Sequence, residues 1–434
     1  MTAKLRIVIS LTVLATAPLL ALPIPTALAA TATTPAPTAT PTRPPGPAVP
    51  PARSATATPS TAPTRPTTAA TATTRVRLPR PTGPDAVGRA TLHLVDRARR
   101  DPWAPGRRRE LMVDVYYPAV AGTGRPARYA TPEEVRLYLT ALDLATVLPV
   151  RAISDAAIAS RTGARPLPGR HPLVLLSPGL GVGRRSLTGL AEQLASQGMV
   201  AATVDHAYES TGTAFPGGRM LTCLACVRMR TDADFRAASR TRGDDLAFVL
   251  TSLTGPHPAW SGAATIDPAR VGAAGHSLGG SAALSLLARD PRVRAGVDMD
   301  GTLGEPVPAG GFGAGRAVLL LGALADHPGP GGTLTPPPDD PDLTWHQAWP
   351  RLRAPRLWLD VDDADHFSFT DDPVIADQLP LPNPTGPPPI SGAQALRITR
   401  AYVGAFLTRW LTGTPQPLLD GPSRTYPQVR VIGR

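Results

Sequence analysis

Apolar runs alternate with amphipathic segments between about residue 91 and residue 411. Residues 91–96 and 110–118 alternate apolar and polar positions, which predicts an opening pair of antiparallel strands. Continuous apolar runs of strand length, as expected for a parallel sheet covered on both faces, occur at 172–177, 199–206, 269–275, 294–300, 316–324 and 355–361. Helical periodicity occurs at 187–198, 244–253, 279–290 and 393–411. This alternation predicts an α/β fold with a mostly parallel sheet and helices on both faces.

The N-terminal part of the chain has a different composition. Residues 1–30 carry Lys4 and Arg6, then an apolar run interrupted by prolines, then a small-residue stretch at 27–29, which is the layout of a cleaved secretory signal peptide. A membrane anchor is the alternative, but the run is short for a span. Residues 31–84 are mostly Thr, Pro and Ala without an acidic residue, which predicts a disordered linker. We therefore expect a secreted or extracellular protein, either free or associated with the cell envelope. Its expected parts are a signal peptide at 1–30, a linker at 31–84, one folded domain at 85–415 and a tail at 416–434.

The net charge of +11 does not indicate a nucleic-acid-binding protein. Lys4 is the only lysine, and the arginines are scattered through the chain instead of forming a stripe. No nucleic-acid motif is present. Weak contact of the arginines with an anionic membrane surface or envelope is the most that this charge predicts.

The two cysteines, Cys223 and Cys226, form a C-x-x-C motif. Such a motif is redox-active in some proteins and half of a zinc site in others, but no second pair completes either arrangement. In an exported chain we expect a local structural disulfide.

Ser277 is the candidate nucleophile. It lies in Gly275-His276-Ser277-Leu278-Gly279, between an apolar strand and a helix of small residues. A tight strand–serine–helix turn projects the hydroxyl clear of the backbone and crowds its neighbours, so that glycines flank it. The alternative is a serine in an ordinary glycine-rich turn, but the position between strand and helix favours a nucleophile.

The same chemistry needs an oxyanion hole and a base. The Leu278 amide lies at a helix N-terminus, where negative charge is stabilised. The glycine-rich loop 177–183 offers the Leu180 amide as a second donor. Among the histidines after Ser277, His366 follows the last expected sheet strand, whereas His327 and His346 lie in other loop segments. His366 is therefore the candidate base.

The residues alone leave the acid open. Asp300 ends the strand after the helix that follows Ser277, Asp326 follows the next strand, and Asp298 is a weaker choice inside its strand. The aspartates around His366 do not match an EF-hand loop, since Ala364 and Asp365 occupy positions that need a ligand and a glycine. We expect no metal and no organic cofactor.

As an ordered set, the segments SPGLG, LASQGMVAATVDH, GHSLGG, VDMDG and DHFSFTD resemble the platelet-activating-factor acetylhydrolase family of α/β-hydrolases, in its secreted bacterial branch. The resemblance runs from about residue 81 to residue 411 and implies the α/β-hydrolase fold. It also implies Ser277 as nucleophile, Asp300 as acid and His366 as base, with the Leu180 and Leu278 amides as the oxyanion hole. One departure is Pro178, where animal members have a histidine.

The resemblance implies a serine carboxylic-ester hydrolase, similar to an acetylhydrolase or phospholipase A2, that acts on lipid-like esters with short acyl chains. A secreted lipase or polyester hydrolase and a serine peptidase are the enzymatic alternatives. A non-catalytic envelope-binding protein on a hydrolase scaffold is the alternative of another class. The folded part has no long apolar insertion that would act as a lid for long acyl chains. Its insertion 327–349 ends in Trp345 and Trp349, which either touch a lipid surface or pack the loop onto the domain.

Overall fold

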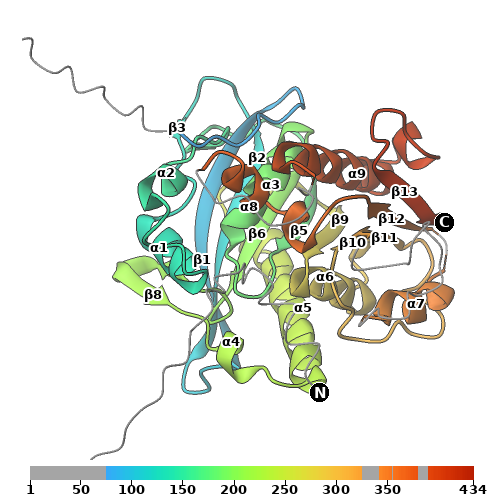
Figure 1. Cartoon of the computed structure of the whole chain (residues 1–434), viewed down its shortest axis with the longest axis horizontal. Helices are drawn as coiled ribbons and strands as arrows, with labels where there is room; N and C mark the ends of the chain where they lie inside the picture. The colour runs from blue at the N-terminus through green and yellow to red at the C-terminus, as the bar shows by residue number, and fades with distance from the viewer. Residues whose placement is uncertain (1–74, 325–341, 354, 380–389) are drawn as a thin grey trace, which may run out of the picture. The chain divides into compact units, whose positions relative to one another are not determined.

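A mixed sheet forms the centre of the fold (Figure 1). The computed structural model describes residues 75–324, 342–353, 355–379 and 390–434. In these residues eleven strands pair in the order β13-β12-β11-β10-β9-β5-β6-β2-β1-β4-β3. The strands are β1 (Ala86–Arg100), β2 (Arg108–Ala119), β3 (Arg125–Pro126), β4 (Arg161–Thr162), β5 (His171–Ser177), β6 (Val200–His206), β9 (Ile266–His276), β10 (Val293–Met299), β11 (Ala317–Ala323), β12 (Arg356–Val361) and β13 (Val429–Gly433). A separate hairpin consists of β7 (Thr213–Phe215) and β8 (Arg219–Leu221).

The central strands of the sheet are parallel. β6, β5, β9, β10, β11 and β12 pair in parallel with their neighbours in this order. β1 and β2 are antiparallel to each other, as the alternation at their positions predicted, and β2 is antiparallel to β6. The predicted fold class is confirmed, and the carboxyl ends of six adjacent parallel strands, β5, β6 and β9–β12, lie at one edge of the sheet.

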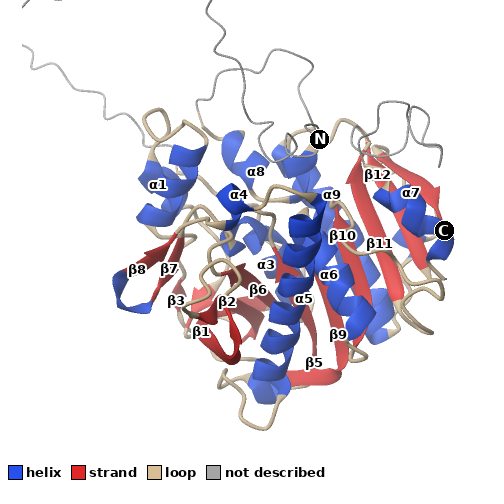
Figure 2. Ribbon diagram, turned by 90° about the horizontal axis from the view of Figure 1, so that it is seen from below, coloured by secondary structure: helices blue, strands red, loops and turns tan. Residues whose placement is uncertain are grey.

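Helices flank the sheet (Figure 2). They are α1 (Pro132–Ala141), α2 (Val150–Ser154), α3 (Thr188–Ser196), α4 (Ala225–Arg228), α5 (Asp232–Thr254), α6 (Leu278–Arg289), α7 (Thr344–Ala348), α8 (Asp372–Ala376) and α9 (Gly392–Thr412). The residues of α5 and α6 share one apolar core with one face of the sheet, and those of α3 and α9 share a second core with the other face.

The strand β5 illustrates why its sequence is apolar throughout. Leu173 and Leu175 belong to the core under α5 and α6, whereas Val174 and Leu176 belong to the core under α3 and α9. All four side chains are fully buried. Since burial of each such side chain contributes about 1.5–3 kcal/mol, both faces of the strand stabilise the fold. A strand with one solvated face would alternate with polar residues instead.

The folded domain extends beyond the expected boundaries at both ends. Val76 and Leu78, in the segment assigned to the linker by composition, are buried in a cluster with α1, α2, α8 and α9. The Leu78 amide also donates to the carbonyl of Ala157 at 3.0 Å. At the other end, β13 pairs antiparallel with β12, so the expected tail adds an edge strand. The composition of these segments did not indicate that they belong to the folded domain. Two buried side chains and a short edge strand change the composition of a segment very little.

Several predictions fall on residues outside the described ranges. These are the signal peptide at 1–30, the linker up to residue 74, the alternative acid Asp326 and the alternative base His327. Within the described ranges, no helix combines the length and the apolar character that a membrane span requires.

The two tryptophans of the insertion pack inward. Trp345 is fully buried and Trp349 is 6% exposed. Both rings contact Trp358 of β12 edge to face, with centroids 5.6 Å apart in each pair. Of the two functions considered for these tryptophans, the structure therefore supports packing of the loop onto the domain.

Candidate active site

Ser277 lies at a sharp turn between the end of β9 and the first residue of α6. Its backbone has φ 57° and ψ −128°, a strained conformation that costs a non-glycine residue about 1–3 kcal/mol. The flanking glycines are required by space. A Cβ at Gly275 would lie 2.1 Å from the Gly279 carbonyl oxygen, and a Cβ at Gly279 would lie 2.0 Å from that of Ser177. The strand–turn–helix geometry predicted from the sequence is confirmed, and such a turn is typical of a nucleophile elbow.

Asp300 and His366 form a hydrogen-bonded pair at the same edge of the sheet. His366 begins a short 3-10 helix, His366–Phe369, after β12, and its Nδ1 lies 2.7 Å from Oδ2 of Asp300. The other carboxylate oxygen, Oδ1, accepts a hydrogen bond from the amide of Ala323 at 2.7 Å. The Asp300 side chain is 1% exposed and that of His366 is 19% exposed. A carboxylate held in this way fixes the imidazole tautomer with the proton on Nδ1, which leaves Nε2 able to accept a proton.

The acid and base segments both contact the elbow. The amide of Ser277 donates to the carbonyl of Met299, one residue before Asp300, at 2.9 Å. Nε2 of His276 lies 2.6 Å from the backbone carbonyl oxygen of His366, and the centroids of the two rings are 4.7 Å apart. Three segments far apart in the sequence therefore meet at Ser277.

The other candidates within the described residues are Asp298 and His346. Asp298 is fully buried in the interior of β10, paired between Gly275 and Leu320. The ring of His346 packs against Trp358, with centroids 5.1 Å apart. A Cβ at Gly280 would lie 1.8 Å from Oδ1 of Asp298, so this carboxylate lies beside the first turn of α6.

Two backbone amides near Ser277 are available to a ligand. In the described part of the chain, neither the Leu180 nor the Leu278 amide donates a hydrogen bond. Leu278 is the first residue of the twelve-residue helix α6, where the helix dipole favours negative charge. Gly279 packs against the carbonyls of Ser177 and Pro178, so the loop containing Leu180 lies directly beside the start of α6. This arrangement fits an oxyanion hole.

Comparison with known proteins identifies relatives of this chain. Residues 71–216 match the family model of platelet-activating factor acetylhydrolase, isoform II. The chain is 27% identical over 396 residues to a probable 1-alkyl-2-acetylglycerophosphocholine esterase of Arthroderma benhamiae, covering 81% of this chain and 92% of the relative. It is 26% identical over 162 residues to the platelet-activating factor acetylhydrolase of Cavia porcellus, covering 30% and 35% of the two chains.

A solved structure matches over its whole length. The ferulic acid esterase from Streptomyces cinnamoneus is 37% identical to this chain, with a TM-score of 0.71, and the match covers 83% of this chain and 100% of the esterase. The chain belongs to the platelet-activating-factor acetylhydrolase-like family of α/β hydrolases. It is a carboxylic ester hydrolase.

In this family member, the sequence did not reveal an apolar cluster beside the elbow. We call it the elbow cluster, and its residues are Trp103, Leu180, Met229, Phe235, Ala238 and Leu278. Trp103 comes from the turn between β1 and β2, and Phe235 and Ala238 come from α5. No periodicity joins these segments, so only tertiary structure could bring them beside Leu180 and Leu278. Apart from backbone groups, the cluster has one polar atom, Nε1 of Trp103, which is buried and has no hydrogen-bond partner in the described residues.

The contacts of His276 were also not predicted from the sequence. Its side chain is 1% exposed, and its Nδ1 is buried without a hydrogen-bond partner in the described ranges. Burial, together with the nearby His366, lowers the pKa of His276 to about 3. The ring is therefore neutral near pH 7, and its Nε2–H donates to the carbonyl of His366. In the sequence, only its position directly before Ser277 indicated that His276 lies near the candidate site.

The aspartates around His366 contact protein groups. Asp360 accepts a hydrogen bond from Nε1 of Trp358 at 3.1 Å, and Asp362 pairs with Arg430 at 2.5 Å. Asp365 caps the short helix that begins at His366, accepting from the amide of Phe367 at 3.0 Å. Each of these three carboxylates therefore has a structural contact.

Cys223 and Cys226 form a disulfide, as expected. The bridge lies at the start of α4, whose first amide, on Ala225, donates to the carbonyl of Tyr208 at 3.0 Å. A Cβ at Gly181, in the loop of the oxyanion candidate, would lie 3.8 Å from the sulfur of Cys226. The disulfide thus stabilises a segment that borders the candidate site.

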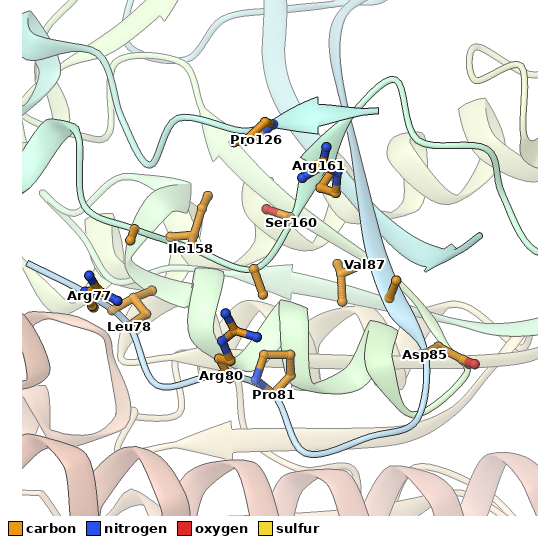
Figure 3. A pocket seen from close by; sticks show the side chains of 13 residues that line it. Arg77, Leu78, Arg80, Pro81, Asp85, Val87, Pro126, Ile158, Ser160 and Arg161 are labelled. Atoms are coloured by element: carbon orange, nitrogen blue, oxygen red, sulfur yellow. The ribbon is translucent and has the colours of Figure 1, made fainter. Parts of the chain in front are cut away.

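A pocket of about 570 Å³ lies away from this site (Figure 3). It is lined by residues of the segments 77–87 and 157–161, together with Pro126. None of the candidate catalytic residues lines it. The candidate active site is therefore defined by its hydrogen bonds and its backbone strain, and not by this pocket.

Proposed function

We propose that this ester hydrolase uses Ser277 as nucleophile, His366 as base and Asp300 as the acid that orients His366. The observation that carries the proposal is the 2.7 Å hydrogen bond between Nδ1 of His366 and Oδ2 of Asp300, beside the strained turn of Ser277. Asp300, and not a residue after the next strand, is the acid in this proposal.

The reaction is acyl transfer in two steps. In the first step, Nε2 of His366 takes the proton of the Ser277 hydroxyl while its oxygen attacks the ester carbonyl. The amides of Leu180 and Leu278 donate to the oxyanion, a contribution of about 3 kcal/mol for each donor. The tetrahedral intermediate collapses, His366 gives its proton to the leaving alcohol, and an acyl-enzyme on Ser277 remains. In the second step His366 activates a water that hydrolyses the acyl-enzyme by the same route.

The proposed substrates are lipid-like esters with short acyl groups. Two relatives are named for the removal of acetyl groups from such esters. Long-chain triacylglycerol hydrolysis is the competing proposal.

A second substrate class is favoured by the elbow cluster. Trp103 and Phe235 contribute aromatic surface beside Leu180 and Leu278, and the relative with the solved structure is a ferulic acid esterase. An aromatic acyl group, such as a hydroxycinnamoyl group, would stack against such rings. We therefore propose aryl-acyl esters as the alternative substrates.

We also propose that the protein is exported. The proposal rests on the signal-peptide layout of residues 1–30 and on the disulfide between Cys223 and Cys226. N-terminal sequencing of protein from a secreting host tests it. Cleavage near residue 30 is expected, and a retained N-terminus on cell-associated protein would contradict it.

A substrate series tests the function. Purified protein is assayed on p-nitrophenyl esters from acetyl to palmitoyl, on methyl ferulate, on a phospholipid with a short sn-2 acyl group and on long-chain triacylglycerol, with Ser277→Ala as the matched control. We expect the highest kcat/KM on the short acyl esters. A rate that rises with chain length would make the protein a lipase, and a maximum on methyl ferulate would favour the aryl-acyl alternative. Equal activity of Ser277→Ala would refute the proposed nucleophile.

A further inference from the structure

A cluster of buried charged groups lies behind the loop that carries Leu180, and the proposed mechanism uses none of them. We call it the ion cluster. Its members have side chains at most 1% exposed, and they are Asp101, Arg109, His206, Glu209, Arg242 and Asp245. Arg99, 27% exposed, adds a contact to Asp245. Removal of charged groups from water is expensive, so a cluster of this kind calls for an explanation beyond packing.

Arg242, on α5, connects this cluster to the loop. Its Nη1 donates to the carbonyl of Pro178 at 2.6 Å, and its Nε donates to Oε2 of Glu209 at 2.7 Å. The guanidinium group is thus held by a carboxylate while it holds a backbone oxygen. The planar group has donors in fixed directions, which suits it to this double contact.

Glu209 holds the other side of the same loop through its backbone. Its carbonyl accepts from the amide of Gly181 at 2.9 Å, and the amide of Thr211 donates to the carbonyl of Gly181 at 3.1 Å. The Glu209 side chain also accepts from Nη2 of Arg109 at 2.6 Å. Burial disfavours its charge, but Arg242 and Arg109 outweigh burial and lower the pKa of Glu209 to about 2. Near pH 7 it therefore stays a carboxylate that anchors both arginines.

These contacts fix the backbone on both sides of Leu180. The carbonyl of Pro178 lies two residues before it, and the amide of Gly181 lies directly after it. Gly181 has φ +79°, and the amide of Val182 closes a turn to the carbonyl of Gly179 at 3.4 Å. That single long bond is a weak restraint on the turn. The direction of the Leu180 N–H thus depends on the two flanking anchors.

We infer that Arg242 is a positioning residue, which holds the carbonyl of Pro178 so that the Leu180 amide points at the oxyanion. This inference rests on the proposed function of the Leu180 amide. The group that would accept a hydrogen bond from the Leu180 amide is the developing oxyanion of an ester substrate.

The test compares Arg242→Met with Arg99→Met. Methionine preserves much of the length of the side chain and removes its donors. Arg99 is the matched control because it pairs with Asp96 and Asp245 of the same region and its side chain makes no hydrogen bond to residues 177–183, all of which the structure describes. We expect Arg242→Met to lower kcat about 100-fold with KM within about threefold, in the range of a lost oxyanion donor. Arg99→Met should change kcat less than threefold.

Two readouts separate positioning from loss of structure. Active-site titration with a fluorophosphonate counts functional molecules, so that kcat is expressed per titrated site. An alkyl boronic acid binds as a tetrahedral adduct that uses the oxyanion hole, whereas a non-hydrolysable ether analogue of the substrate binds without one. In Arg242→Met, the Ki of the boronic acid should rise in proportion to the loss of kcat/KM, and the Ki of the ether should stay within about threefold.

If Arg242→Met does not fold, Arg242→Lys is judged by the same criteria. Its single ammonium group cannot reproduce both contacts, so we expect a loss of about tenfold in kcat per titrated site. Wild-type kcat per titrated site, or equal losses in the Arg242 and Arg99 variants, would overturn the inference. If instead the proposed function is wrong, the wild-type protein itself lacks Ser277-dependent esterase activity, and the two failures can therefore be told apart.

Discussion

Replacement of His276 by glutamine tests the burial of this ring beside the elbow. The pKa of His276 is lowered to about 3, whereas an unfolded chain has the ordinary histidine value of 6.5. Between these values the unfolded chain binds a proton that the folded protein does not bind. The stabilising effect of the neutral ring is therefore complete above pH 6.5 and is lost as the pH falls.

The magnitude follows from proton linkage. At pH 5 the ring is neutral in the folded protein and almost fully protonated in the unfolded chain. The free energy of unfolding is then lower than at pH 8 by about 2 kcal/mol from this residue alone, since pH 5 lies about 1.5 units below the unfolded pKa. Glutamine preserves a donor for the carbonyl of His366 and does not titrate.

The assay is urea unfolding followed by tryptophan fluorescence at pH 8, 7, 6 and 5, for the wild type and for His276→Gln. The decrease in unfolding free energy from pH 8 to pH 5 should be smaller in the variant by about 2 kcal/mol. His257→Gln is the control, since His257 is an exposed histidine. Parallel pH dependences for the wild type and His276→Gln would refute the reasoning, because the ring would then be accessible to protons in the folded protein.

Three further predictions concern the site and its surroundings. Asp300→Asn should lower kcat by about 10⁴ with an unchanged fold by circular dichroism, because the amide favours the wrong imidazole tautomer. A loss below tenfold in an ester assay would identify another acid. Activity should be unchanged after dialysis against EDTA, and a loss restored by calcium would show that the aspartates around His366 hold a metal. Replacement of Cys223 and Cys226 by serine should lower the unfolding free energy by at most about 2 kcal/mol, because the closed loop is short, and should leave esterase activity within about threefold. Loss of folding at 25 °C would contradict this.

The central part of the fold could be predicted because each element carries its own pattern. Strands such as β5, buried on both faces, are apolar throughout, and the elbow at Ser277 depends on residues adjacent in sequence. The segment of α5 was predicted only from residue 244, although the helix begins at Asp232 after a capping box of Thr231 and Asp234. Its first half is mostly polar, with Arg240 and Arg242 paired to glutamates and only Phe235 and Ala238 in the elbow cluster, so hydrophobic periodicity did not reveal it.

The site was predictable where the spacing of elements determines it, and not where distant side chains do. Asp300 follows the strand next to Ser277, so topology brings the two together. By contrast, Arg242 reaches the carbonyl of Pro178 and His276 reaches that of His366, and both acceptors are backbone atoms that a sequence pattern does not identify. Val76 and Leu78 were missed for a related reason, because buried residues in a proline-rich and arginine-rich segment do not form a periodic run.

Covalent labelling tests the central claim most directly. The purified protein is incubated with one equivalent of a fluorophosphonate, and the intact mass and the labelled peptide are determined by mass spectrometry, with Ser277→Ala as the control. The account predicts a single adduct on Ser277, loss of esterase activity in parallel with labelling, and no adduct on the alanine variant. An adduct on another residue, or an unlabelled protein with a native circular dichroism spectrum, would contradict it.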